Sequence, residues 1–146
     1  MRSLFVGLLA LSMLSASPVL AQSATFASTM STCTAVINEQ YASDDDPLPR
    51  WLECVGAVQQ YLVAIGAPSA AADPAIGELV AALSELYQED PDCKIKETEL
   101  PIAIATAAAQ VFDDNVKAEY ILIGEQISGC ELSGTAAIED DTASPG

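Results

Sequence analysis

Residues 100–115, which read LPIAIATAAAQVFDDN, decide how the chain folds. The stretch from Leu100 to Phe112 has almost no polar face, so it predicts the most deeply buried helix of the protein. Asp113–Asn115 then brings together three poor helix formers, which predicts a tight corner. If the chain turns there, a further helix folds back along the first. If it does not turn, one long helix continues towards Cys130.

The residues after this corner carry apolar side chains at helical spacing and predict a last helix that ends at Gly129. Its apolar stripe consists of Val116, Tyr120, Ile123, Ile127 and Cys130. Residues 131–146 are polar, small and acidic, which is typical of a disordered tail.

The first two predicted helices flank an acidic, proline-containing turn at residues 44–49. Proline cannot continue a helix, so this turn ends the first helix, and the second begins near Pro49. The second helix stops at Gly66. The apolar stripe of the first helix is Phe26, Met30, Cys33, Ile37 and Tyr41. That of the second is Trp51, Cys54, Val55, Val58, Tyr61, Leu62 and Ile65.

The third predicted helix takes Asp73 as its N-cap and Pro74 as its first residue, and it ends before Pro91. Its stripe is Ile76, Leu79, Val80, Leu83, Leu86 and Tyr87. Thr98 is the expected cap of the fourth helix, where Glu99 is favourable beside the positive helix end. The patterns together predict an all-α fold, a four- to five-helix bundle of antiparallel helical hairpins stapled by two disulfides.

Residues 1–21 have the order of a secretory signal peptide. A basic start at Arg2 is followed by a short apolar run and by small or short residues before a cut predicted after Ala21. A membrane span needs roughly 20 apolar residues, so an uncleaved anchor is the less favoured alternative. We expect residues 22–130 to form one helical domain in the periplasm or outside the cell, with no membrane insertion after cleavage.

All four cysteines, Cys33, Cys54, Cys93 and Cys130, follow the predicted leader. An even number in an exported chain predicts disulfides, and the absence of histidine and of a C-x-x-C pair disfavours zinc or redox chemistry. If both ends of the domain fold as hairpins, Cys33–Cys54 and Cys93–Cys130 come within reach, and we favour this pairing. If the chain does not turn after Phe112, the rival pairing is Cys54–Cys93 with Cys33–Cys130.

Acidic side chains dominate the charge, because 21 Asp and Glu stand against 5 Lys and Arg, for a net charge of −16. Such a surface repels nucleic-acid phosphates and anionic lipid head groups, so neither is an expected partner. A cationic protein or peptide is electrostatically compatible with it, although solubility alone also accounts for the charge.

The inventory of catalytic groups is small. Without histidine, neither a Ser-His-Asp triad nor a Cys-His pair can form. The candidate acids all fall on polar helix faces and predict solvated carboxylates: Glu53, Glu78, Glu85, Glu119 and Glu125. Asp44–Asp46 lacks the spacing of a calcium loop and is interpreted as part of a turn. We therefore expect no enzymatic activity, no metal and no cofactor.

Cys54-Val55-Gly56 at the start of a helix is similar to the Cys-x-Gly start of a helix in the periplasmic immunity proteins that protect bacteria from type VI secretion effectors. Those proteins are small, exported, helical and disulfide-bonded, and a cysteine closes their last helix, as Cys130 does here. The similarity covers the general layout and this tripeptide. The chain departs from that pattern in the extra helix before Cys93 and in Ala57, where an aromatic residue is expected.

These observations lead us to expect a non-enzymatic protein-binding module of the inhibitor or immunity type. The alternative is a passive structural or stress-related envelope protein with no dedicated partner. A groove between amphipathic helices would be the binding surface, but no pattern in the sequence assigns its residues.

Overall fold

The computed structural model describes residues 24–43 and 52–131, and in this part of the chain the fold is entirely helical, with no strand. The expected leader, the turn at 44–49, Trp51 and nearly all of the expected tail lie outside the described residues. The elements are α1 (Phe26–Ala42), α2 (Glu53–Ala64), α3 (Asp73–Ser84), the short 3-10 helix η2 (Lys94–Glu97), α4 (Leu100–Ala109) and α5 (Asp114–Ser128).

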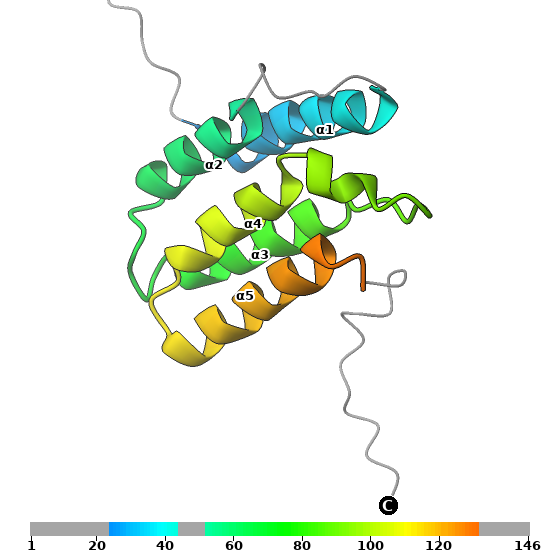
Figure 1. Cartoon of the computed structure of the whole chain (residues 1–146). Coiled ribbons are helices and arrows are strands. Elements are labelled where there is room, and N and C mark those ends of the chain that lie inside the picture. The colour runs from blue at the N-terminus through cyan, green and yellow to red at the C-terminus, as the bar shows by residue number, and fades with distance from the viewer. Residues whose placement is uncertain (1–23, 44–51, 132–146) are drawn as a thin grey trace, which may run out of the picture.

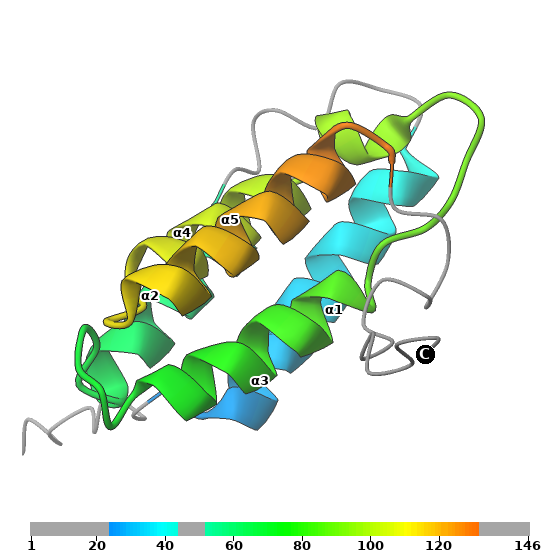
Figure 2. The same ribbon diagram turned by 90° about the horizontal axis from the view of Figure 1, so that it is seen from below.

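Helix α4 lies at the centre of this arrangement, since it packs against α2 on one side, α5 on the other and α3 beneath. Figures 1 and 2 show α2, α4 and α5 as one layer, with α1 and α3 forming a second layer behind it. Helix α1 covers the inner side of α2 and also contacts α3. The core therefore lies between the two layers, and the outer side of α4 has no helix over it among the described residues.

The corner predicted after residue 112 is confirmed. Helix α4 ends at Ala109, and Asp113 adopts an extended conformation as the N-cap of α5. Its carboxylate accepts hydrogen bonds from the backbone N–H groups of Asn115 at 2.9 Å and Val116 at 3.3 Å. A short polar side chain satisfies two N–H groups that the first turn of a helix leaves without partners.

The expectation that Leu100–Phe112 forms the most deeply buried helix agrees with α4, in which five of ten residues are buried, but one side of this stretch is exposed. Leu100, Ala103, Ile104 and Ala107 are fully buried, but Ile102 is 46% exposed and Phe112 is 62% exposed. The apolar residues of this stretch show that the helix is hydrophobic, but they do not show how many other helices pack against it. Helices pack against α4 from three directions only, so its fourth face remains apolar and open to solvent.

The prediction that Asp73 is the N-cap of the third helix is wrong. Asp73 is the first residue of α3, and the N-cap position before it is Ala72, which makes no side-chain capping bond. The Asp73 carboxylate instead accepts hydrogen bonds from the N–H groups of Phe112 at 2.8 Å and Asp113 at 3.0 Å. The start of α3 is thereby tied to the corner between α4 and α5.

We expect Asp73→Ala to destabilise the protein by about 1 kcal/mol, because it removes two hydrogen bonds from one carboxylate, while water can reach the exposed N–H groups of Phe112 and Asp113. Urea unfolding followed by circular dichroism measures the loss. Asp114→Ala is the control, since this side chain is 96% exposed and meets Lys117 only at 3.9 Å. Equal losses in the two variants would show that Asp73 does not hold the corner.

Two disulfides join different helical segments of the chain. Cys33 of α1 is bonded to Cys54 of α2, with 4.4 Å between their Cα atoms, and both residues are fully buried. Cys93 before η2 is bonded to Cys130 after α5, with 5.9 Å between their Cα atoms. The structure thus has the sequential pairing and not the rival one, because the corner at Asp113 returns the chain to the level at which α4 begins.

Candidate functional site

The carboxylates singled out in the sequence do not form a site. Glu53, Glu78, Glu85, Glu119 and Glu125 are all exposed. Glu53 lies on α2, Glu78 in the middle of α3 and Glu85 at its C-cap, and Glu119 and Glu125 lie on α5. Their positions agree with the solvated faces that the sequence predicts, and the structure brings no pair of them together in a hydrogen bond.

A different carboxylate, Glu99, is buried at the start of α4 with only 4% of its surface exposed. One carboxylate oxygen, Oε2, accepts a hydrogen bond from Nε2 of Gln40 at 3.0 Å. The other, Oε1, accepts from the backbone N–H of Val55 at 3.4 Å. The Glu99 N–H in turn donates to Oε1 of Gln40 at 2.9 Å. These bonds connect α1, α2 and α4 through one acidic side chain.

In the sequence, Glu99 is recognisable only as a favourable charge at a helix start, so the contact between Gln40 and Glu99 was not predicted. Gln40 is the residue from which a buried polar contact could have been predicted. It follows Cys33 by seven residues and Ile37 by three, which places it on the buried stripe of α1. A polar side chain on an apolar stripe needs a hydrogen-bonding partner, so Gln40 indicates a buried polar contact even though its partner cannot be identified from the sequence.

A small pocket opens beside Glu99, with about 70 Å³ of space. Its lining consists of Gln40, Leu52, Lys96, Glu97, Thr98, Glu99 and Ile102. The accessible lining is mainly apolar, with Leu52 and Ile102 as exposed apolar walls, and Gln40, Glu97, Thr98 and Glu99 supply its polar groups. Both of these walls are nearly half exposed.

The pocket lies at one end of a larger exposed apolar surface, which we call the α4 face. It consists of Leu52, Val63, Ile102, Ala105, Ala109 and Ile121. The large side chains among them are between 42% and 78% exposed. Ile102, Ala105 and Ala109 recur at helical spacing along the uncovered side of α4. Figure 1 shows this helix between α2 and α5, which supply the flanking residues.

Helix geometry places the flanking residues on the α4 side of their own helices. Val63 follows Leu52 by about three helical turns, so the two lie along one side of α2. Leu52 and Ile102 line the same pocket, which brings this side next to α4. Ile121 precedes Gly124 by one turn, and Gly124 faces Ile104 of α4, since an added Cβ would lie at contact distance, 3.4 Å, from Cγ2 of Ile104.

Acidic residues border the α4 face. Glu97 lines the pocket, Asp113 and Asp114 follow at the corner beyond the far end of α4, and Glu125 lies one turn after Ile121. Two lysines lie near them: Lys96 at the pocket, and Lys117, which pairs with Asp114. The border is thus negative overall, in a chain whose net charge is −16.

The aromatic residues expected in the core are only partly described, since Trp51 lies outside the described residues. Tyr61 is buried, and its ring meets that of Phe26 edge to face, with 6.2 Å between their centroids. Burial raises the pKa of the Tyr61 phenol, and nearby Glu78 adds to the rise, so the hydroxyl remains protonated at neutral pH. Tyr61 is a packing residue and not part of a ligand platform.

Within the described residues, no group of three or more His, Cys, Asp or Glu side chains is placed to hold a metal ion. In the same part of the chain, no helix has the length and hydrophobicity that crossing a membrane requires.

The protein is strongly acidic, and its described part is helical and carries two disulfides. Its disulfides suit an oxidising, extracytoplasmic environment. No known protein family, curated protein or solved structure matches the chain.

Proposed function

We propose that this protein is a non-enzymatic binding module of the periplasm or the exterior of the cell, and that it binds a basic protein segment through the α4 face. The observation that carries the proposal is an exposed apolar surface bordered by acids on a strongly acidic domain. A contiguous apolar surface with a polar border is typical of interaction sites. The helical hairpins α1–α2 and α4–α5, each held by a disulfide, would keep that surface rigid in an antiparallel bundle.

The preferred occupant is an amphipathic helix with a basic polar side. Its apolar residues would cover Ile102, Ala105 and Ala109, in the manner of helices that bind into apolar grooves. Its lysines or arginines would meet Glu97, Asp113 and Glu125 at the border. Opposite charges at such a border accelerate encounter and select the partner, and salt screens both effects.

A second copy of this chain is a poorer occupant, because two chains of net charge −16 repel each other across any shared interface. An inhibitor or immunity-type role accords with a rigid acidic scaffold that covers a basic surface of its partner. The second candidate, a passive envelope protein without a dedicated partner, gives no reason for the apolar α4 face to remain exposed.

The binding test uses a synthetic amphipathic peptide with leucines on one side and arginines on the other, titrated calorimetrically into the oxidised protein. Ala105→Gln places a polar amide in the middle of the α4 face, and we expect it to weaken binding about fivefold or more, since covered apolar contacts are lost. Ala35→Gln is the matched control, because Ala35 is an exposed helical alanine on α1 in the other layer.

Binding should also weaken as the salt concentration rises, because the border charges are exposed. Equal affinities of the Ala105→Gln and Ala35→Gln variants, or no binding of the peptide to the wild-type protein at low salt, would contradict the proposal. A salt-independent affinity would show that the acidic border does not select the partner.

A further inference from the structure

Resting on the proposed function, we infer that the pocket beside Glu99 is a subsite for one arginine side chain of the basic partner. The pocket is continuous with the α4 face, because Leu52 and Ile102 belong to both. Its lining includes Glu99, which is more than nine-tenths buried, whereas the other acids of the border are exposed. A cation that reaches Glu99 therefore meets a charge that water screens little.

The two carboxylate oxygens of Glu99 can still accept hydrogen bonds from a bidentate donor. Among the described residues, Oε1 accepts one bond, from Val55, and Oε2 accepts one bond, from Gln40. Each carboxylate oxygen has two lone pairs, so one acceptor position remains on each oxygen. A guanidinium presents two parallel N–H donors at the spacing of carboxylate oxygens, which a lysine ammonium does not.

The size and lining of the pocket also fit an arginine. A water molecule needs roughly 10–15 Å³ of such space. The 70 Å³ of the pocket is several times that amount and accepts the four heavy atoms of a guanidinium. The aliphatic stem of the arginine would pass between Leu52 and Ile102, and long basic side chains commonly bury their stems against apolar walls in this way.

Two exposed charged residues of the pocket lining affect the affinity of the subsite for a cation. Glu97 adds a second negative charge at the lining, while Lys96 borders the same space as an exposed cation. Lys96 repels an incoming guanidinium, so its removal strengthens the binding of an arginine. A purely structural role for Glu99, as a buried tie to Gln40, predicts that removing Lys96 changes the affinity no more than removing Lys117, the other lysine of the border.

The test compares the arginine-containing amphipathic peptide with the same peptide in which citrulline, a neutral isostere, replaces every arginine. We expect Glu99→Gln to weaken binding of the arginine peptide about tenfold or more, since charge-assisted hydrogen bonds are lost. Glu99→Gln and the wild-type protein should bind the citrulline peptide with the same affinity. Lys96→Ala should strengthen binding of the arginine peptide about twofold to fivefold. Glu85→Gln, an equal charge change on the exposed end of α3, should alter it less than twofold.

Equal effects of Glu99→Gln and Glu85→Gln would overturn the subsite, because only net charge would then matter. Equal affinities of the citrulline and arginine peptides for the wild-type protein would overturn it as well. If Glu99→Gln does not fold, as judged by circular dichroism, Lys96→Ala compared with Lys117→Ala still decides the question, because equal effects of these two variants on the affinity for the arginine peptide would overturn the subsite. Loss of binding in Ala105→Gln without loss in Glu99→Gln would preserve the proposed function and reject the arginine subsite.

Discussion

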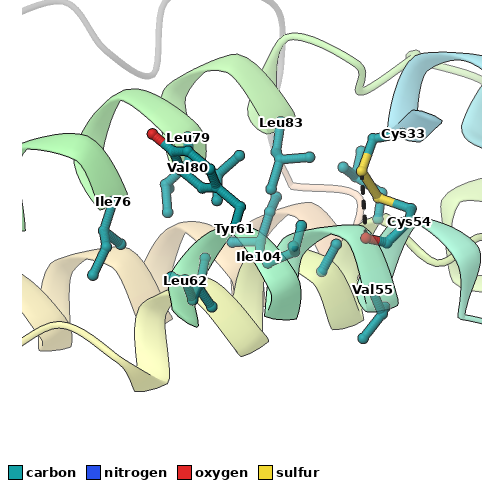
Figure 3. Close-up of a cluster of buried hydrophobic side chains, with 14 of the residues drawn as sticks. Cys33, Cys54, Val55, Tyr61, Leu62, Ile76, Leu79, Val80, Leu83 and Ile104 are labelled. Atoms are coloured by element: carbon teal, nitrogen blue, oxygen red, sulfur yellow. Dashed lines mark hydrogen bonds between the residues drawn. A yellow bond between two sulfur atoms is a disulfide. The ribbon is translucent and has the colours of Figure 1, made fainter. Parts of the chain in front are cut away.

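The double variant Cys33→Ala/Cys54→Ala is expected to lose about 5 kcal/mol of its free energy of unfolding. A bridge that closes a loop of this length contributes about 3 kcal/mol by restricting the unfolded chain. The two sulfur atoms are fully buried between α1 and α2, and Figure 3 shows them among the core side chains. Removing them leaves unfilled space that costs about 1 kcal/mol for each atom. The total is comparable to the whole stability of many single domains.

Urea unfolding under non-reducing conditions measures this loss, and Cys93→Ala/Cys130→Ala is the matched control. The control bridge spans 37 residues instead of 21, so loop closure alone makes it the stronger one. It is only partly buried, however, and its removal leaves no internal void. We expect a loss of about 4 kcal/mol for the control. A greater loss in the control than in Cys33→Ala/Cys54→Ala would show that packing around the buried bridge contributes little.

Ile104→Ala is expected to destabilise the protein by about 3–4 kcal/mol, the ordinary cost of truncating a fully buried isoleucine. Ile104 lies on the inner side of α4, close to α2 and α3 in Figure 3. Its Cγ2 also faces Gly124 of α5. No single neighbouring helix can move inward to fill the space without losing contact with the others.

Ile102→Ala provides the comparison, because it removes the same atoms from the same helix two residues earlier. Ile102 is 46% exposed, so the substitution should cost less than about 1 kcal/mol. Thermal or chemical unfolding of both variants checks the difference. Equal losses would contradict the two-layer arrangement, in which one side of α4 is core and the other side is surface.

The contact between α3 and α5 depends on a glycine whose role is invisible in the sequence. A Cβ on Gly77 of α3 would lie 2.6 Å from the hydroxyl oxygen of Tyr120 of α5. Read along the chain, Gly77 is only a weak point in a helix. In the folded protein, it leaves the space that the Tyr120 side chain occupies.

The local features of the fold follow from the sequence by itself. Apolar spacing identified the five α-helices of residues 24–43 and 52–131, and Asp113–Asn115 identified the corner on which the disulfide pairing depends. These features depend on residues within one or two turns of each other, so helix periodicity and capping chemistry determine them. Even the pairing Cys33–Cys54 and Cys93–Cys130 follows once the hairpins are assumed, because each bridge spans neighbouring elements.

Only the tertiary structure decided which surfaces the helices leave uncovered and which polar groups they enclose. The sequence marks residues 100–112 as apolar, but the positions of α2, α3 and α5 decide that Ile104 is core and Ile102 is surface. Asp73 and Glu99 are ordinary acids at helix starts until other segments bring N–H donors to them. Hydrophobicity and capping act within a segment, whereas exposure and burial of a side chain depend on partners far along the chain.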